Sequence, residues 1–151
     1  MKTQQNSSPR GEVGRGLPLN NNPLNIRKVP GTHWKGELPS IQGGDGGGSF
    51  VRFESMEWGI RAALCILATY KRKYNAICIE DIITRWAPPS ENDTQSYIKN
   101  VCRLTGFGGK ERLTENEWPT LVRAMAYIES GIMLSQEIIN QSYKLYKNRK
   151  P

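Results

Sequence analysis

The chain has few of the residues that hold metal ions or form disulfide frameworks. Among its 151 residues there is one histidine, His33, and there are three cysteines with no Cys-x-x-Cys pair. This argues against a structural zinc site, and we expect neither a metal nor an organic cofactor. Cys65, Cys78 and Cys102 are odd in number and stand among apolar residues, which predicts small buried thiols in a reducing compartment.

Long apolar runs are also missing. No stretch reaches the roughly 18 apolar residues of a membrane-spanning helix, and residues 1–16 lack the apolar centre of a secretory signal. We therefore expect synthesis in the cytoplasm without a signal peptide. Action on the periplasm or cell wall would need delivery by a virion or a secretion system, or release on lysis. Residues 1–16 are expected to be a flexible tail, and residues 17–151 a single domain.

Acidic residues are the scarcer charged type. The chain has 14 Asp and Glu against 21 Lys and Arg, which gives a net charge of +7. This balance favours an anionic partner such as nucleic acid, acidic lipid or the carboxylate-rich bacterial cell wall. The basic residues gather at expected helix ends, where cations suit the helix dipole. Since no expected helix combines Arg or Lys with Asn or Gln on one face, the sequence argues against nucleic acid.

Hydrophobic periodicity predicts a mainly helical domain of the α+β class with one small β-hairpin. Helical spacing covers Ser55 to about Lys73, Ile79 to Trp86, Asn92 or Asp93 to Gly106, Thr114 to Gly131, and Ser135 through Leu145. Two short strands are expected at residues 33–38 and 50–54, joined by a glycine-rich connection that carries Asp45. That connection lacks a following Lys-Ser/Thr pair, which argues against phosphate binding.

One carboxylate lies on an apolar helical face. Val122, Met125, Ala126 and Glu129 follow helical spacing, and Glu129 stands next to the expected helix end. Burial and the free carbonyls of that end would both raise the pKa of Glu129. An acid that keeps its proton near neutral pH can protonate the leaving oxygen in glycoside cleavage. The alternative is a half-buried glutamate that bonds to a nearby backbone amide.

Several segments carry a resemblance to a known superfamily. Glu129-Ser130-Gly131 at a helix end resembles the catalytic helix of the lysozyme-like superfamily, in particular goose-type lysozymes and lytic transglycosylases. Residues 22–27, Trp34-Lys35-Gly36 and Phe50 with Phe53 resemble the asparagine-rich hairpin segment of related peptidoglycan hydrolases. Residues 85–89 and 92–101 resemble two later segments of lytic transglycosylases. Residues 20–106 also resemble phage-associated and bacterial proteins with the pattern NNPxNIR…RWAPPxENDTxxYIxxV, some of them virion structural proteins.

The resemblance implies a fold and a set of roles. Because the Glu-Ser-Gly helix follows the hairpin here, it implies a lysozyme-like domain circularly permuted so that the catalytic helix is C-terminal. Glu129 would be the general acid, and Tyr97 would hydrogen-bond the acid or the sugar. Substrate contacts would come from Asn22, Asn25, Arg27, Trp34, Trp86 and Ser130. The residues alone leave other roles open, namely core packing for Trp86 and Tyr97 and turn formation for Asn20 to Asn22.

The implied substrate is the glycan strand of peptidoglycan. A second carboxylate, for which Glu37 and Asp45 are candidates, would direct water to the sugar and make the protein a muramidase. Without one, ionised Glu129 would remove the proton of the muramyl 6-hydroxyl, which gives the 1,6-anhydro product of a lytic transglycosylase. We favour the second route. The alternative is a non-catalytic virion structural or cell-wall-binding protein of the same fold.

Overall fold

The mainly helical fold with a small hairpin is confirmed. A computed structural model describes residues 20–39 and 49–149. In these ranges, five α-helices (α2 to α6) and one 3-10 helix (η1) accompany a two-stranded antiparallel sheet. Within the same ranges no helix is long and apolar enough to cross a membrane. The expected tail at residues 1–16 lies outside the described residues.

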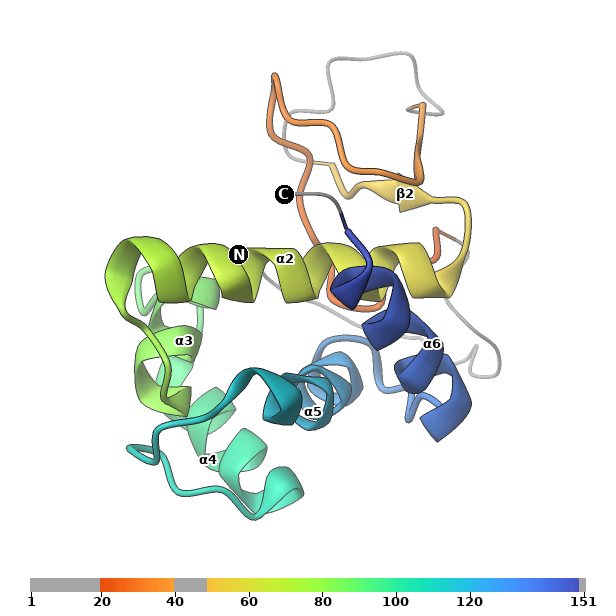
Figure 1. Cartoon of the computed structure of the whole chain (residues 1–151). Helices are drawn as coiled ribbons and strands as arrows, with labels where there is room; N and C mark the ends of the chain where they lie inside the picture. Colours follow the sequence, from red (N-terminus) through yellow and green to blue (C-terminus); the bar gives the residue numbers. More distant parts are fainter. Residues whose placement is uncertain (1–19, 40–48, 150–151) are drawn as a thin grey trace.

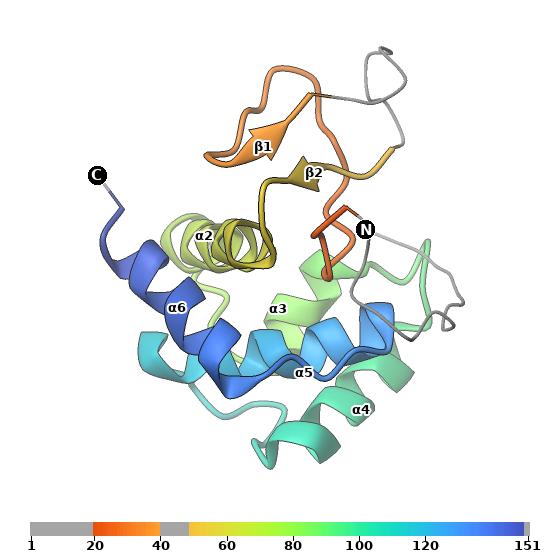
Figure 2. The same ribbon diagram turned by 90° about the vertical axis from the view of Figure 1, so that its right-hand side faces the viewer.

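Helix α2 (Met56–Tyr74) is the longest element and runs between the two parts of the molecule. Strands β1 and β2 lie on one side of it, and α3, α4 and α5 lie on the other (Figures 1 and 2). The helix begins where the Ser55 side chain accepts a hydrogen bond from the Trp58 N–H, as the sequence predicts. It ends at Asn75, which adopts a left-handed conformation with φ of 54°.

The remaining helices are α3 (Ile79–Trp86), α4 (Thr94–Thr105), η1 (Glu115–Glu117), α5 (Trp118–Ser130) and α6 (Gln136–Lys147). The predicted starts of α4 and α6 are confirmed, because the side chains of Asp93 and Ser135 cap these helices. Glycines in the left-handed conformation end α4 and α5 at residues 106 and 131. Helix α2 packs against α5 and α6, while α4 packs against α3 and α5.

The strands are shorter than predicted. Strand β1 is Glu37–Leu38 and strand β2 is Arg52–Phe53, so the predicted spans 33–38 and 50–54 were too long. A turn closed by the Glu37 N–H and the Trp34 carbonyl, with Gly36 at φ of 82°, bends the chain before β1. The segment before β2 pairs instead with residues 26–28, through the Val51 N–H and the Ile26 carbonyl.

Aromatic and aliphatic side chains from all the helices form one core. Trp86, Trp118, Tyr146 and Phe53 are its largest members, and each is almost completely buried. Their burial removes large apolar areas from water, which stabilises the packing of both parts against α2. The three cysteines are free and half-buried, so the prediction of buried thiols was only partly right.

Candidate functional site

Glu129 lies at the C-terminal end of α5, as predicted. Val122, Met125 and Ala126 on the same helical face are fully buried, and they set this face of α5 into the core. Glu129 itself is half-buried, one turn further along the helix. Gly131 then turns the chain away with φ of 73°. The carboxylate is thus carried to the edge of the core by the packing of its own helix.

Three side chains from distant parts of the chain donate hydrogen bonds to this carboxylate. Trp86 Nε1 and the Tyr97 hydroxyl donate to Oε2 over 3.1 and 2.9 Å. Asn25 Nδ2 donates to Oε1 over 3.1 Å. The donors come from α3, α4 and the segment before β1, so the fold fixes the orientation of the carboxylate from three directions.

Tyr97 is positioned to remain protonated. Its side chain is buried, and burial raises its pKa well above the usual value, with a further rise from the neighbouring charge and hydrogen bond of Glu129. The phenol therefore remains a hydrogen-bond donor throughout the neutral range. Of the two partners that the resemblance implied for Tyr97, the acid or the sugar, its hydroxyl contacts the candidate acid.

Residues 20–27, which we call the asparagine turn, hold the end of α5. The Asn25 amide also donates to the Glu129 backbone carbonyl over 3.3 Å, and the Ser130 hydroxyl donates to the Pro23 carbonyl over 2.6 Å. Asn25 adopts φ of 56°, a left-handed conformation that asparagine tolerates better than most residues. The turn therefore supplies both a donor to the carboxylate and a support for the helix end.

Asn22 has a structural role, and its predicted contact with substrate was wrong. It is 1% exposed, and its amide donates to the Ile26 and Val51 carbonyls over 2.9 and 2.8 Å. Its Oδ1 accepts the Ile26 N–H over 2.9 Å. An amide used in this way holds the turn against the strand segment and has no open face for a sugar.

Trp86 does not stack on a sugar either. Its side chain is fully buried, and its indole N–H points to Glu129. The sequence offered a hint of this role, because the N–H of a buried tryptophan usually has a hydrogen-bond partner. Trp34 is half-buried against the core, and the Arg27 guanidinium lies over the Phe50 ring at 5.0 Å. The substrate contacts of these two residues stay predictions.

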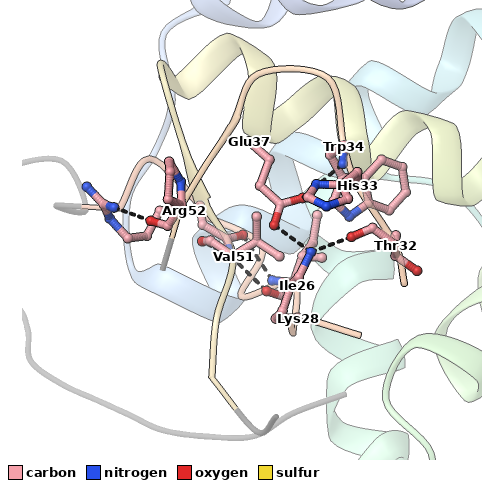
Figure 3. Close-up of polar contacts among 10 residues, drawn as sticks. Ile26, Lys28, Thr32, His33, Trp34, Glu37, Val51 and Arg52 are labelled. Carbon is pink, nitrogen blue, oxygen red and sulfur yellow. Dashed lines mark hydrogen bonds and ion pairs between the residues drawn. The ribbon is translucent and has the colours of Figure 1, made fainter. Parts of the chain in front are cut away.

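Glu37 belongs to a separate polar network (Figure 3). Its Oε2 pairs with Lys28 Nζ at 2.7 Å, and its Oε1 accepts the Trp34 N–H over 2.9 Å. Lys28 also donates to the Thr32 carbonyl. Burial raises the pKa of Glu37, but the bonds from Lys28 and Trp34 outweigh it and hold the pKa below the usual value. Glu37 thus braces the loop before β1. Asp45, the other candidate, lies outside the described residues.

Comparison with known proteins gives one close relationship. The chain is 42% identical over 122 residues to "Protein P5" of Pseudoalteromonas phage PM2, and the match covers 80% of this chain and 73% of that protein. The chain belongs to the P5 family. No model of a known protein family matches the chain.

The described part of this P5-family chain offers no cluster for a metal ion. Within residues 20–39 and 49–149, no group of three or more His, Cys, Asp or Glu side chains is placed to hold one. The candidate site consists of Glu129 with its donors Asn25, Trp86 and Tyr97. Such an arrangement can present a carboxyl group in a fixed orientation, either to exchange a proton or to stabilise a developing positive charge.

Proposed function

We propose that the chain cleaves the glycan strands of peptidoglycan, with Glu129 as general acid and then base. One observation carries the proposal: Trp86, Tyr97 and Asn25 converge on a carboxylate at the end of a buried helix. Catalytic groups need this type of fixed orientation. The predicted Glu-Ser-Gly helix end and the net charge of +7, which suits a polymer rich in carboxylates, support the same function.

The fold proposed for this activity is a circularly permuted lysozyme-like domain. The long helix α2 between the hairpin side and the α3–α5 side supports it (Figure 2). The acid lies on α5, after the hairpin in chain order, and α6 follows it. The similarity to a phage protein favours a phage setting for this activity.

The proposed reaction is of the lytic transglycosylase type. Glu129 gives its proton to the bridging oxygen as the bond from the muramyl C1 to that oxygen breaks. The ionised carboxylate then takes the proton of the muramyl 6-hydroxyl, whose oxygen bonds to C1. Glu129 is thereby protonated again. We favour this route because Lys28 binds one Glu37 oxygen and the Trp34 N–H binds the other, which leaves Glu37 poorly placed to direct a water molecule.

The test is digestion of purified sacculi, followed by mass spectrometry of the products. We expect 1,6-anhydro ends, which differ from reducing ends by one water. Glu129→Gln should abolish turnover while the thermal melt stays close to that of the native chain. Tyr97→Phe, which keeps the ring and removes the donor, should reduce turnover by about 10- to 100-fold. Undiminished lysis by a folded Glu129→Gln protein would show that Glu129 is not the acid.

A second function is favoured by the same contacts. All three donors to Glu129 come from the chain itself, which is also how a purely structural buried carboxylate is satisfied. The chain would then be a virion structural or wall-binding protein. Absence of products from the native protein, combined with a large loss of stability in Glu129→Gln, would support this function over catalysis.

A further inference from the structure

The outer face of α3 forms part of a hollow of about 620 Å³. Helical spacing places three polar residues of α3 on this exposed face, while the opposite face, which includes Trp86, is buried. The end of α2 and the segment after each helix complete the walls. The lining residues are Tyr74, Ala76, Asp81, Thr84, Arg85 and Pro88. The hollow and the Glu129 network thus lie on opposite sides of one short helix.

Arg85 is held in the hollow by stacking. Its Cζ lies 3.4 Å from the centroid of the Tyr74 ring, and Lys73 Nζ lies 5.9 Å from the same centroid. A guanidinium that stacks on a ring keeps its N–H donors at its edges, where they can meet a carboxylate in bidentate fashion. In the part of the chain that the structure describes, the Arg85 side chain makes no hydrogen bond or ion pair.

An opposite charge lines the same hollow. Asp81 lies one turn before Arg85 on α3 and is exposed, yet the two side chains do not form an ion pair. The buried Ala76 and the half-exposed Tyr74 ring also line the hollow. A site lined by a cation, an anion and apolar side chains suits a ligand that carries an ammonium and a carboxylate on one carbon.

We propose that this hollow binds the zwitterionic side-chain end of a diamino acid in the stem peptide of peptidoglycan. Arg85 takes the carboxylate, Asp81 takes the ammonium, and the apolar wall of Ala76 and Pro88 contacts the alkyl chain. This inference rests on the proposed function.

The test uses the full chain with Glu129→Gln, so that binding is measured without turnover. The probes are the tripeptide L-Ala–D-Glu–meso-diaminopimelate and the same tripeptide with L-lysine in the third position, titrated by calorimetry. We expect the first to bind about tenfold more tightly, because only it carries the second carboxylate. Arg85→Ala and Asp81→Asn should each weaken its binding by about tenfold or more.

The matched control is Arg72→Ala, which removes the same charge from an exposed position that does not line the hollow. It should bind the peptide as the parent does. Arg85→Lys keeps the charge but loses the planar donors, so it should bind the peptide weakly, as Arg85→Ala does. If Arg85→Ala does not fold, Arg85→Lys still tests the role of the guanidinium. Equal binding of the two tripeptides, or equal binding by the Arg85 and Arg72 variants, would overturn the proposal.

Two further outcomes separate this inference from the proposed function. Glycan strands stripped of their stem peptides should still be cleaved by the native chain if Glu129 is the acid, whatever the hollow binds. Peptide binding without any cleavage would support the hollow and contradict the catalytic proposal. Duplex DNA binding that Arg85→Ala removes, with no peptide binding, would overturn the peptide assignment in favour of a phosphate ligand.

Discussion

The hydroxyl oxygen of Ser130 lies 2.6 Å from the carbonyl oxygen of Pro23, and this bond joins positions 107 residues apart. Together with the two bonds from the Asn25 amide, it attaches the end of α5 to the asparagine turn. The position of the Glu129 carboxylate therefore depends on a segment near the other end of the described chain. Changes in that segment should affect the candidate acid without altering α5 itself.

Asn25→Gly should separate the role of the amide from the conformation of the turn. Glycine adopts the φ of 56° at no steric cost, so the change removes the bonds to Glu129 and keeps the backbone. We expect glycan cleavage to fall by about tenfold or more because the carboxylate loses one of its anchors. The free energy of unfolding should fall by about 1 kcal/mol. Turnover and denaturant unfolding measure the two effects.

Asn21→Gly is the matched control for that change. Asn21 has the same φ of 56°, and its amide donates to the Phe53 carbonyl over 3.0 Å instead of to Glu129. It should lose a similar amount of stability and retain its turnover. A drop in turnover as large as that of Asn25→Gly would mean that the turn acts as a whole and that the Asn25 amide has no particular role.

The Lys28–Glu37 pair should behave as a structural brace. Lys28→Met leaves a carboxylate that is 8% exposed without its cation, so we expect a loss of about 3 kcal/mol in the free energy of unfolding. The double variant with Glu37→Gln should lose less than the sum of the two single changes, as measured by denaturant unfolding. Glu37→Gln alone should leave the anhydro product pattern unchanged. A selective loss of reducing ends would instead identify Glu37 as the base that activates water.

Gly59 allows the asparagine turn to approach α2. A Cβ at this position would lie 2.2 Å from the Asn21 carbonyl oxygen. Gly59→Ala should therefore destabilise the protein by about 2–3 kcal/mol through overpacking, although alanine favours a helix by about 1 kcal/mol. Gly31→Ala meets nothing within 4 Å and should lose only about 1 kcal/mol, from its φ of 86°. Thermal melts of the two variants make the comparison.

Stability at acid pH should depend on the bond between Tyr146 and Glu115. The Tyr146 hydroxyl donates to Glu115 over 2.5 Å and lowers the pKa of that carboxyl, burial opposes this, and Lys147 lowers the pKa further. Because the pKa of Glu115 is lower in the folded state, its ionised form stabilises the protein at pH values above the ordinary pKa of 4.5. This stabilisation is lost as the pH falls through the folded-state pKa. Tyr146→Phe should lose about 1 kcal/mol or less at pH 7, since the Glu115 side chain that accepts this bond is 34% exposed.

The measurement is a series of melts between pH 7 and pH 3 on both proteins. The difference between them should shrink as the pH falls, because protonated Glu115 no longer gains from the phenol. A difference that stays constant over this range would show that the Tyr146 hydroxyl contributes through packing and not through the charge of Glu115.

Local signals in the sequence predicted the helices well. Ser55, Asp93 and Ser135 cap their helices, and the left-handed glycines at 106 and 131 end two of them, because capping depends on groups a few residues apart. The strands were predicted less well. Their length was decided by the turn at Gly36 and by residues 26–28, which pair with the segment before β2. Alternation of apolar and polar residues along the chain does not reveal such pairing.

The sequence by itself determined which face of each helix is buried, where the helices begin and end, and that Glu129 stands at a helix end beside apolar neighbours. Only the tertiary structure decided what surrounds that carboxylate. Trp86 and Asn25 lie 43 and 104 positions away from Glu129, and spacing along the chain carries no information on such contacts. Their roles follow from the packing of α3 and of the asparagine turn around α5, since long-range contacts are set by the shape of the whole core.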